Sequence, residues 1–273
     1  MTASWVEIGD RVFVRRYRFF DQNIVVVLGG DEALVLDTRT TPRQARELLD
    51  DLRELGAPPV GIVVNSHGHS DHVFGNQVFA PAPIWGHERC VTMVTRSGRR
   101  QLEGVATAIP DLADDLAEVT FTPPTCTFLE QATICLADQR EVELAYLGRG
   151  HTDNDIVMRV PDADVLCAGD LLEAGAAPFF GDGFPMDWPA TAEALLGMVG
   201  PTTVVVPGHG DHGGRAFVEA SLEGFRAVAA AATRVHAGEL RLEEAIPLVP
   251  YSAAEAVEPL QRALAQLRGE LDA

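Results

Sequence analysis

The segment Asn65-Ser66-His67-Gly68-His69-Ser70-Asp71-His72 decides the interpretation of this chain, because it concentrates imidazole and carboxylate groups in one short loop. These groups are natural ligands of zinc and similar divalent ions, and three of the eight histidines lie here. In an extended loop His67 and His69 turn toward one ion, and Gly68 lets the backbone bend tightly between them. Asp71 and His72 face a different direction, where they could hold a second ion. The segment therefore predicts a site for two metal ions.

The elements that flank this loop are predicted by their apolar patterns. The loop follows a buried strand at residues 60–65, and open sheets usually place ligand sites at such strand ends. A helix at residues 42–55 precedes it, with Thr41 as its cap, Pro42 at its first position and Gly56 at its end. Alternation predicts other strands at residues 5–17 and 23–37, with hairpin turns at 9–10 and 29–31, and at 83–86, 126–128, 132–136, 141–147, 155–160, 164–168 and 203–206. Helices are predicted to begin near residue 72, to span 87–116 with an interruption near 109, to begin at 187, and to span 215–236.

Both halves of the chain run from strands to a helix and then to a buried strand that ends in a histidine-bearing loop. This order predicts a two-layer sheet core with helices outside, an α/β (α+β) fold. The tail from residue 237 is helical again, with Leu260, Leu264, Leu267 and Leu271 at helical spacing. We expect one domain at residues 1–236, and a helical extension at 237–273 that packs on it or forms an oligomer contact.

Three further residues lie where predicted strands end. His151 follows Gly150, Asp170 follows a buried strand, and His209 lies in the segment Pro207-Gly208-His209-Gly210. Each alone is a weak signal, because a histidine beside glycine is often a turn residue. Together they matter, since two metal ions need more ligands than the first loop supplies.

At this point the sequence resembles the metallo-beta-lactamase superfamily. The resemblance covers residues 5–225 and rests on four motifs in the family's order: His67-x-His69-x-Asp71-His72, Gly150-His151-Thr152, Ala168-Gly169-Asp170 and Val206-Pro207-Gly208-His209-Gly210. It implies a four-layer αββα sandwich with the site at one edge of two sheets, in agreement with the layers predicted above.

The resemblance also implies roles for individual residues. It implies two sets of metal ligands and a bridge. One ion is held by His67, His69 and His151, a second is held by Asp71, His72 and His209, and Asp170 lies between them. Asp37 resembles the family's strand-end aspartate that supports a ligand histidine from behind, although an ordinary turn aspartate remains an equal alternative. The ions expected are two divalent metals, zinc first, with iron or manganese as alternatives.

The amino-acid composition excludes some classes of binding partner. The net charge is −19, from 21 basic and 40 acidic residues, and every basic residue is Arg. Such a balance repels phosphate backbones and anionic membrane surfaces, so we expect neither nucleic acid nor membrane as a partner. No run of eighteen apolar residues and no signal peptide is present, which favours a cytoplasmic location.

The expected reaction is hydrolysis by a metal-bound hydroxide. Two ions lower the pKa of water from ~15.7 toward ~7, and they stabilise the charge that develops on an attacked carbonyl. Asp71 is the candidate catalytic residue that accepts and passes on the proton. We expect a small, partly apolar carbonyl substrate: a lactone, ester, thioester or lactam. Aromatic residues near the motifs are candidate pocket walls: Phe19, Phe20, Phe179, Phe180 and Trp188.

Departures at three positions from the best-known subgroup of true beta-lactamases argue for weak antibiotic hydrolysis at most. In that subgroup Cys stands at the position of Asp170 and Arg at that of His72. A Lys that grips the beta-lactam carboxylate stands at the position of Glu173. Alternatives to a hydrolase are a non-heme iron oxidoreductase of the persulfide dioxygenase kind and a non-catalytic metal-binding protein. Metal content and a hydrolysis screen distinguish them.

Overall fold

The computed structural model describes residues 4–271 and shows two halves, each a layer of strands. The first half contains β1 (Val6–Gly9), β2 (Val12–Tyr17), β3 (Gln22–Gly29), β4 (Glu32–Leu36), β5 (Val60–Val64), β6 (Ile84–His87) and β7 (Cys126–Phe128). The second contains β8 (Gln131–Cys135), β9 (Glu141–Tyr146), β10 (Ile156–Val160), β11 (Val165–Glu173) and β12 (Val204–His209). Hydrogen bonds connect them in the order β7-β6-β5-β4-β3-β12-β11-β10-β9-β8, with β2 on β3 and β1 on β2. The halves meet where Gln22 of β3 lies opposite His209 of β12.

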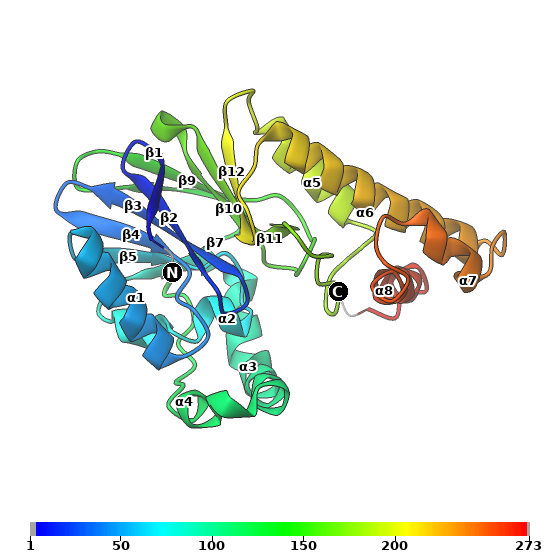
Figure 1. The fold of residues 1–273 in the computed structure, drawn as a ribbon, viewed down its shortest axis with the longest axis horizontal. Helices are drawn as coiled ribbons and strands as arrows, with labels where there is room; N and C mark the ends of the chain where they lie inside the picture. The colour runs from blue at the N-terminus through cyan, green and yellow to red at the C-terminus, as the bar shows by residue number, and fades with distance from the viewer. Residues whose placement is uncertain (1–3, 272–273) are drawn as a thin grey trace.

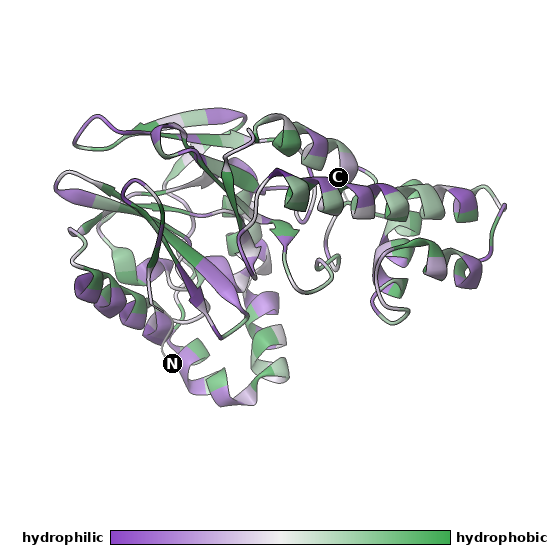
Figure 2. Cartoon of the chain, turned by 45° about the horizontal axis from the view of Figure 1, so that its top comes forward, coloured by the Kyte–Doolittle hydropathy of each residue, from purple (hydrophilic) through white to green (hydrophobic). Residues whose placement is uncertain are grey.

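The inner core lies between the two layers. Val25, Val27 and Leu36 of the first half pack in one cluster with side chains of the second half such as Leu144 and Met158. All five side chains are buried, and burial of each contributes roughly 1.5–3 kcal/mol. The hydrophobic residues run along the strands (Figure 2). The two layers therefore face each other, as the strand patterns predicted.

Helices cover the outer faces (Figure 1). They are α1 (Pro42–Leu55), α2 (Ser70–Val73), α3 (Glu88–Ala108), α4 (Ala113–Ala117), α5 (Trp188–Gly197), α6 (Arg215–His236), α7 (Leu242–Ala245) and α8 (Val257–Leu267), with short 3-10 turns at η1 (Asn76–Phe79), η2 (Pro110–Leu112), η3 (Pro161–Ala163) and η4 (Ile246–Leu248). α1 packs on the first half; α5, α6 and α8 pack on the second. The predicted four-layer α/β/β/α arrangement is confirmed.

Helix α1 shows how local sequence sets the bounds of an element. The Thr41 hydroxyl accepts a hydrogen bond from the backbone N–H of Gln44, and Pro42 occupies the first turn. Gly56 ends the helix with φ of 78°, a left-handed conformation that suits glycine. Leu48 and Leu52 are buried against β4 and β5. The predicted bounds, 42–55, are confirmed.

The structure differs from the predictions at β11. We expected a strand at residues 164–168, but β11 continues to Glu173. The extra residues belong to the strand because β11 pairs in parallel with β12 as far as Glu173. The pairing is irregular around Gly169, whose φ is 54°. The bend allows Asp170 to continue along the strand toward the site.

The tail forms a second helical layer beside α6. Leu260 and Ala263 of α8 are buried in the same cluster as Phe225 of α6. The helical character of the tail is confirmed, while the domain boundary at residue 236 and the oligomer contact stay predictions. Within residues 4–271, no helix combines the length and apolar character needed to cross a membrane.

Candidate metal centre

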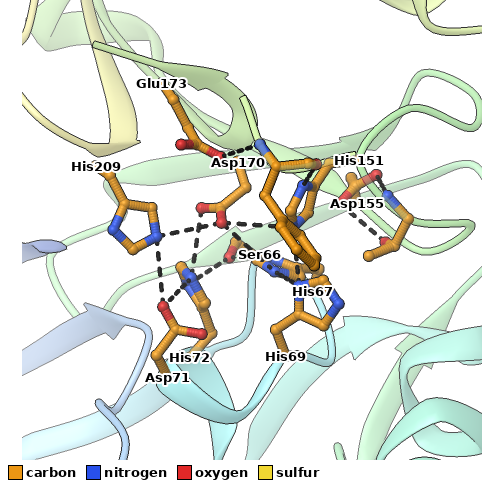
Figure 3. Close-up of polar contacts among 12 residues, drawn as sticks. Ser66, His67, His69, Asp71, His72, His151, Asp155, Asp170, Glu173 and His209 are labelled. Atoms are coloured by element: carbon orange, nitrogen blue, oxygen red, sulfur yellow. Dashed lines mark hydrogen bonds and ion pairs between the residues drawn. The ribbon is translucent and has the colours of Figure 1, made fainter. Parts of the chain in front are cut away.

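Seven residues converge at the edge where the two layers meet (Figure 3). They come from five places: the loop after β5, the short helix α2, the loop after β9, the bent part of β11 and the end of β12. These are the seven predicted ligand residues: His67, His69, Asp71, His72, His151, Asp170 and His209. The fold thus brings together side chains separated by up to 142 positions (67 to 209).

Three histidines form the first cluster. The Nδ1 atom of His69 lies 3.0 Å from Nε2 of His67 and 2.8 Å from Nε2 of His151. Three ring nitrogens this close together cannot all be joined by hydrogen bonds, so some of their lone pairs would face one another. A cation at their centre would accept all three lone pairs. Zinc–nitrogen bonds of about 2.0–2.1 Å fit such a spacing. We call this group the three-histidine cluster.

Asp71, His72 and His209 form the second cluster. The Asp71 Oδ2 atom lies 3.3 Å from Nε2 of His72 and 3.4 Å from Nε2 of His209. His72 is fully buried, whereas the other two are partly exposed toward a cavity. Two imidazoles and one carboxylate are a common donor set for zinc and related ions.

Asp170 lies between the two clusters. Its Oδ1 atom is 3.3 Å from Nε2 of His72, and its Oδ2 atom is 3.2 Å from Nε2 of His209. The same Oδ2 atom lies 3.5 Å from Nε2 of His151 and 3.8 Å from Nε2 of His67. One carboxylate therefore reaches donors of both clusters.

Unsatisfied polar atoms test whether a metal fits. Nε2 of His72 and Oδ1 of Asp170 are buried and make no hydrogen bond within the described residues. Burying such atoms without a partner costs free energy. Both atoms face the second cluster, so a cation there would satisfy them. The donor set and its geometry fit divalent metal ions.

Partners behind the rings hold each histidine in place. Asp37 Oδ2 lies 2.8 Å from Nδ1 of His72, and Asp37 also accepts hydrogen bonds from the backbone N–H and hydroxyl of Ser66. The Ser66 hydroxyl lies 3.1 Å from Nδ1 of His67. An acceptor behind the ring keeps the proton on the far nitrogen and leaves the inner lone pair for a metal.

The other three rings have acceptors as well. Nδ1 of His209 donates to the carbonyl of Phe20 over 2.6 Å, and Nδ1 of His151 donates to the carbonyl of Phe179 over 3.1 Å. Nε2 of His69 lies 3.0 Å from Oδ2 of Asp182. Every histidine of both clusters is thus oriented by a group outside the ligand set.

The electrostatics of the site match this picture. Burial lowers the pKa of His151 to about 4 and holds the pKa of His67 well below its ordinary value, so both are neutral. Burial opposes ionisation of Asp71 and Asp170, but the neighbouring histidines outweigh it and hold both pKa values well below the ordinary value. Burial also opposes the charged forms of His72 and His209, but the carboxylates outweigh it and raise the pKa of His72 well above its ordinary value and that of His209 to about 11. These two rings therefore carry the positive charge that balances Asp71 and Asp170, and a divalent ion bound there would replace their protons.

A cavity of about 1080 Å³ opens above the two clusters. His69, Asp71, His151, Asp170 and His209 form its base, so both clusters can be reached from it. Glu173 stands beside the base, and burial together with the charge of Asp170 raises its pKa to about 7. The cavity is where a substrate could meet the metal site.

The predicted substrate-binding aromatics divide into two groups. Phe20 and Phe179 line the cavity with 42% and 51% of their surface exposed. Phe180 and Trp188 do not line it; they are buried in the outer core, where their ring centroids lie 4.9 Å apart. Phe19 packs against the α2–α4 region instead. These three candidates do not line the cavity, because Phe180 and Trp188 pack in the outer core and Phe19 packs in a separate apolar cluster.

Sequence patterns did not indicate three residues at this site. Asp182 sits between two glycines in a loop after β11, and its hydrogen bond with His69 outweighs burial and lowers its pKa to about 2. Arg100 of α3 and Arg262 of α8, which are far apart in the sequence, also line the cavity. Only Asp182 had a local signal, the Gly181-Asp182-Gly183 turn, and that signal is too common to indicate a site.

Comparison with known proteins identifies the family. Residues 17–209 match the family model of the metallo-beta-lactamase superfamily. The chain belongs to this superfamily. Among its curated members, the type 2 metallo-beta-lactamase of Bacteroides fragilis is 25% identical over 227 residues, which cover 79% of this chain and 82% of the relative. The type 2 enzyme of Bacillus cereus is 24% identical over 204 residues, which cover 72% and 71%.

Solved structures of superfamily members share the fold. The metallo-beta-lactamase FIM-1 from Pseudomonas aeruginosa, in its mono-zinc form, aligns with a TM-score of 0.66 at 16% identity, over 83% of this chain and 96% of that one. TMB-1 aligns with a TM-score of 0.63 at 20% identity, over 82% and 96%. These likenesses show that the chain shares the fold of the metallo-beta-lactamases.

Proposed function

We propose that the protein is a dinuclear metal-dependent hydrolase that opens a small carbonyl compound. The observation that carries the proposal is the position of Asp170 between two complete donor clusters. In this proposal the three-histidine cluster holds one ion, Asp71, His72 and His209 hold the second, and Asp170 bridges them. Zinc is the metal best matched to this donor set, with iron or manganese as alternatives.

Residues of the chain would accept the proton and orient the metal ligands. Two ions bound here would supply a water of lowered pKa and would polarise the substrate carbonyl. Asp71 faces both the second cluster and the cavity, so its carboxylate can accept the proton that the attacking water loses. Asp37 and Asp182 hold ring nitrogens in the tautomer that leaves lone pairs facing inward.

The cavity supports a partly apolar substrate. Phe20 and Phe179 expose rings at its walls, and Val105 of α3 adds an aliphatic surface. Exposed aromatics that gather at a concave site are typical of ligand binding. A lactone, ester, thioester or lactam with an apolar side chain would pack that side chain against these walls.

Glu173 argues against a substrate carboxylate close to the scissile bond. Its side chain lies near Asp170 and His151, where donor atoms of all three are within 4.8 Å of one another. Above its pKa of about 7 Glu173 is ionised, and it would then repel a second negative charge here. Beta-lactam hydrolysis is nevertheless the second candidate, because type 2 metallo-beta-lactamases are among the relatives; we expect it to be weak.

The test is a hydrolysis screen of the zinc-, manganese- and iron-loaded protein with lactones, thioesters, carboxylic esters and a beta-lactam. Zinc-dependent turnover of a neutral lactone or ester above that of the beta-lactam supports the proposal. Replacing Glu173→Lys should raise beta-lactam turnover relative to the neutral ester. Stoichiometric iron in protein purified without added metal, with oxygen-dependent activity, would contradict the hydrolase and favour the oxidoreductase.

A further inference from the structure

The segment from Ala174 to Asp187, here called the 174–187 loop, connects β11 to α5 without helix or strand. It supplies two of the three acceptors behind the three-histidine cluster. The Phe179 carbonyl accepts from His151, and the Asp182 carboxylate accepts from His69. The conformation of this loop therefore sets the orientation of two of the three rings.

Helix α8 holds the loop at two points. The Nε–H of Arg262 donates to the carbonyl of Gly183 over 2.8 Å, one residue beyond Asp182. The side-chain oxygen of Gln266 accepts from the backbone N–H of Met186 over 2.9 Å. Arg262 and Gln266 are one helical turn apart, so both face the loop from the same side of α8.

The helix that makes these bonds is itself fixed. Leu260 and Ala263 are buried in the outer core. On the loop, the Phe180 ring is buried in the same core, and the N–H of Phe184 donates to the Gly150 carbonyl over 2.7 Å. A loop without internal secondary structure has large conformational entropy to lose, so such external bonds determine which conformation it adopts.

We propose that α8 is a positioning element of the metal site: through Arg262 and Gln266 it fixes the 174–187 loop, and the loop fixes His69 and His151. The proposal rests on the proposed function in taking a divalent ion as the ligand of the three-histidine cluster. The tail is then part of the metal site although none of its residues is a predicted ligand. Partners behind metal-binding histidines typically change metal affinity about 10–100-fold.

The first experiment uses glutamines of the same helix. Gln266→Ala removes the acceptor for Met186, Gln266→Glu keeps an acceptor, and Gln261→Ala is the matched control, because Gln261 is exposed and makes no side-chain hydrogen bond among the described residues. Each full-length variant is titrated with Co²⁺ and followed by visible absorption. We expect Gln266→Ala to bind the ion of the three-histidine cluster about tenfold more weakly, with an altered spectrum. Gln266→Glu and Gln261→Ala should match the wild type.

A second experiment does not depend on metal. Arg262→Gln and Gln266→Ala should speed hydrogen exchange of amides in the 174–187 loop of the metal-free protein, with the rates of α1 and β3 unchanged. Equal exchange rates and equal Co²⁺ affinity in wild type and both variants would overturn the role of α8. A wild-type protein that binds no Co²⁺ would instead overturn the proposed function, while the exchange rates would still decide whether α8 holds the loop.

Discussion

Two loops approach the same metal site and differ in how they contribute. The loop that runs from Asn65 to His72 carries four predicted ligands within six residues. The 174–187 loop carries no predicted ligand, yet it supplies acceptors for His69 and His151. The first loop is short and directly follows strand β5, whose last two residues are buried, whereas the second is long and depends on bonds to α8.

The comparison separates residues that would bind the metal from groups that only orient those residues. Donor groups for a metal must be particular residue types at close spacing, so they leave a pattern in the sequence. A group that orients a donor needs only an acceptor in the right place, and a backbone carbonyl such as that of Phe179 serves as well as a side chain. Three variants test how far this division holds, and a fourth tests a buried histidine outside both loops.

The largest effect is expected from the ligand loop. His69→Ala removes the nitrogen that lies within 3.0 Å of both other members of the three-histidine cluster. Metal at this cluster should be lost, and activity should fall roughly a hundredfold or more. Metal analysis with an activity assay checks this. His236→Ala, an exposed histidine at the end of α6, should change neither. A His69→Ala protein that still binds two metals would show that the ligand assignment is wrong.

The next effect concerns the orienting loop. Asp182→Ala leaves Nε2 of His69 without its acceptor, so the ring loses its fixed tautomer. We expect metal affinity to fall about 10–100-fold while the seven predicted ligands remain in place. Competition with a chelator measures it. An unchanged affinity would mean that the 174–187 loop has no orienting role through Asp182.

A smaller effect separates the side chain from the backbone of one residue. Phe179→Ala deletes the exposed ring that lines the cavity but keeps the carbonyl that accepts from His151. A ring that is half exposed contributes about 1 kcal/mol, so KM should rise about fivefold with metal content unchanged. Leu129→Ala, another exposed apolar residue that does not line the cavity, is the control. Loss of metal from Phe179→Ala would contradict the assignment of separate roles.

The smallest effect concerns a histidine outside both loops. Burial lowers the pKa of His87 below its ordinary value of 6.5. The unfolded chain therefore binds a proton more readily than the folded one, and the stability that His87 provides is lost as pH falls below about 6.5. His87→Gln removes this titration. As pH falls from 7.5 to 5.5, the wild type should lose stability that the variant never had, so the difference between their urea midpoints should become smaller. A pH-independent gap between the two midpoints would contradict this reasoning.

The metal-ligand loop and the layer order could be predicted because each depends on local patterns. Helix α1 was predicted with its bounds because cap, proline and terminal glycine are adjacent in sequence. The extent of β11 was not, since its last residues are held by pairing with β12 rather than by apolar alternation. Phe180 was a candidate wall of the cavity but is buried in the core, because nothing in the neighbouring sequence indicates which way each ring of the loop points.

The sequence by itself determined the donor groups, the fold class and the superfamily, because metal ligands and buried strands both require particular residue types at short, regular spacing. Tertiary structure alone decided which carbonyls and carboxylates orient those donors, which aromatics reach the cavity, and that Arg262 contacts the loop beside the site. The physical reason is distance along the chain. Arg262 lies 79 residues from Gly183, and a hydrogen bond between such distant groups depends on packing that no local pattern encodes.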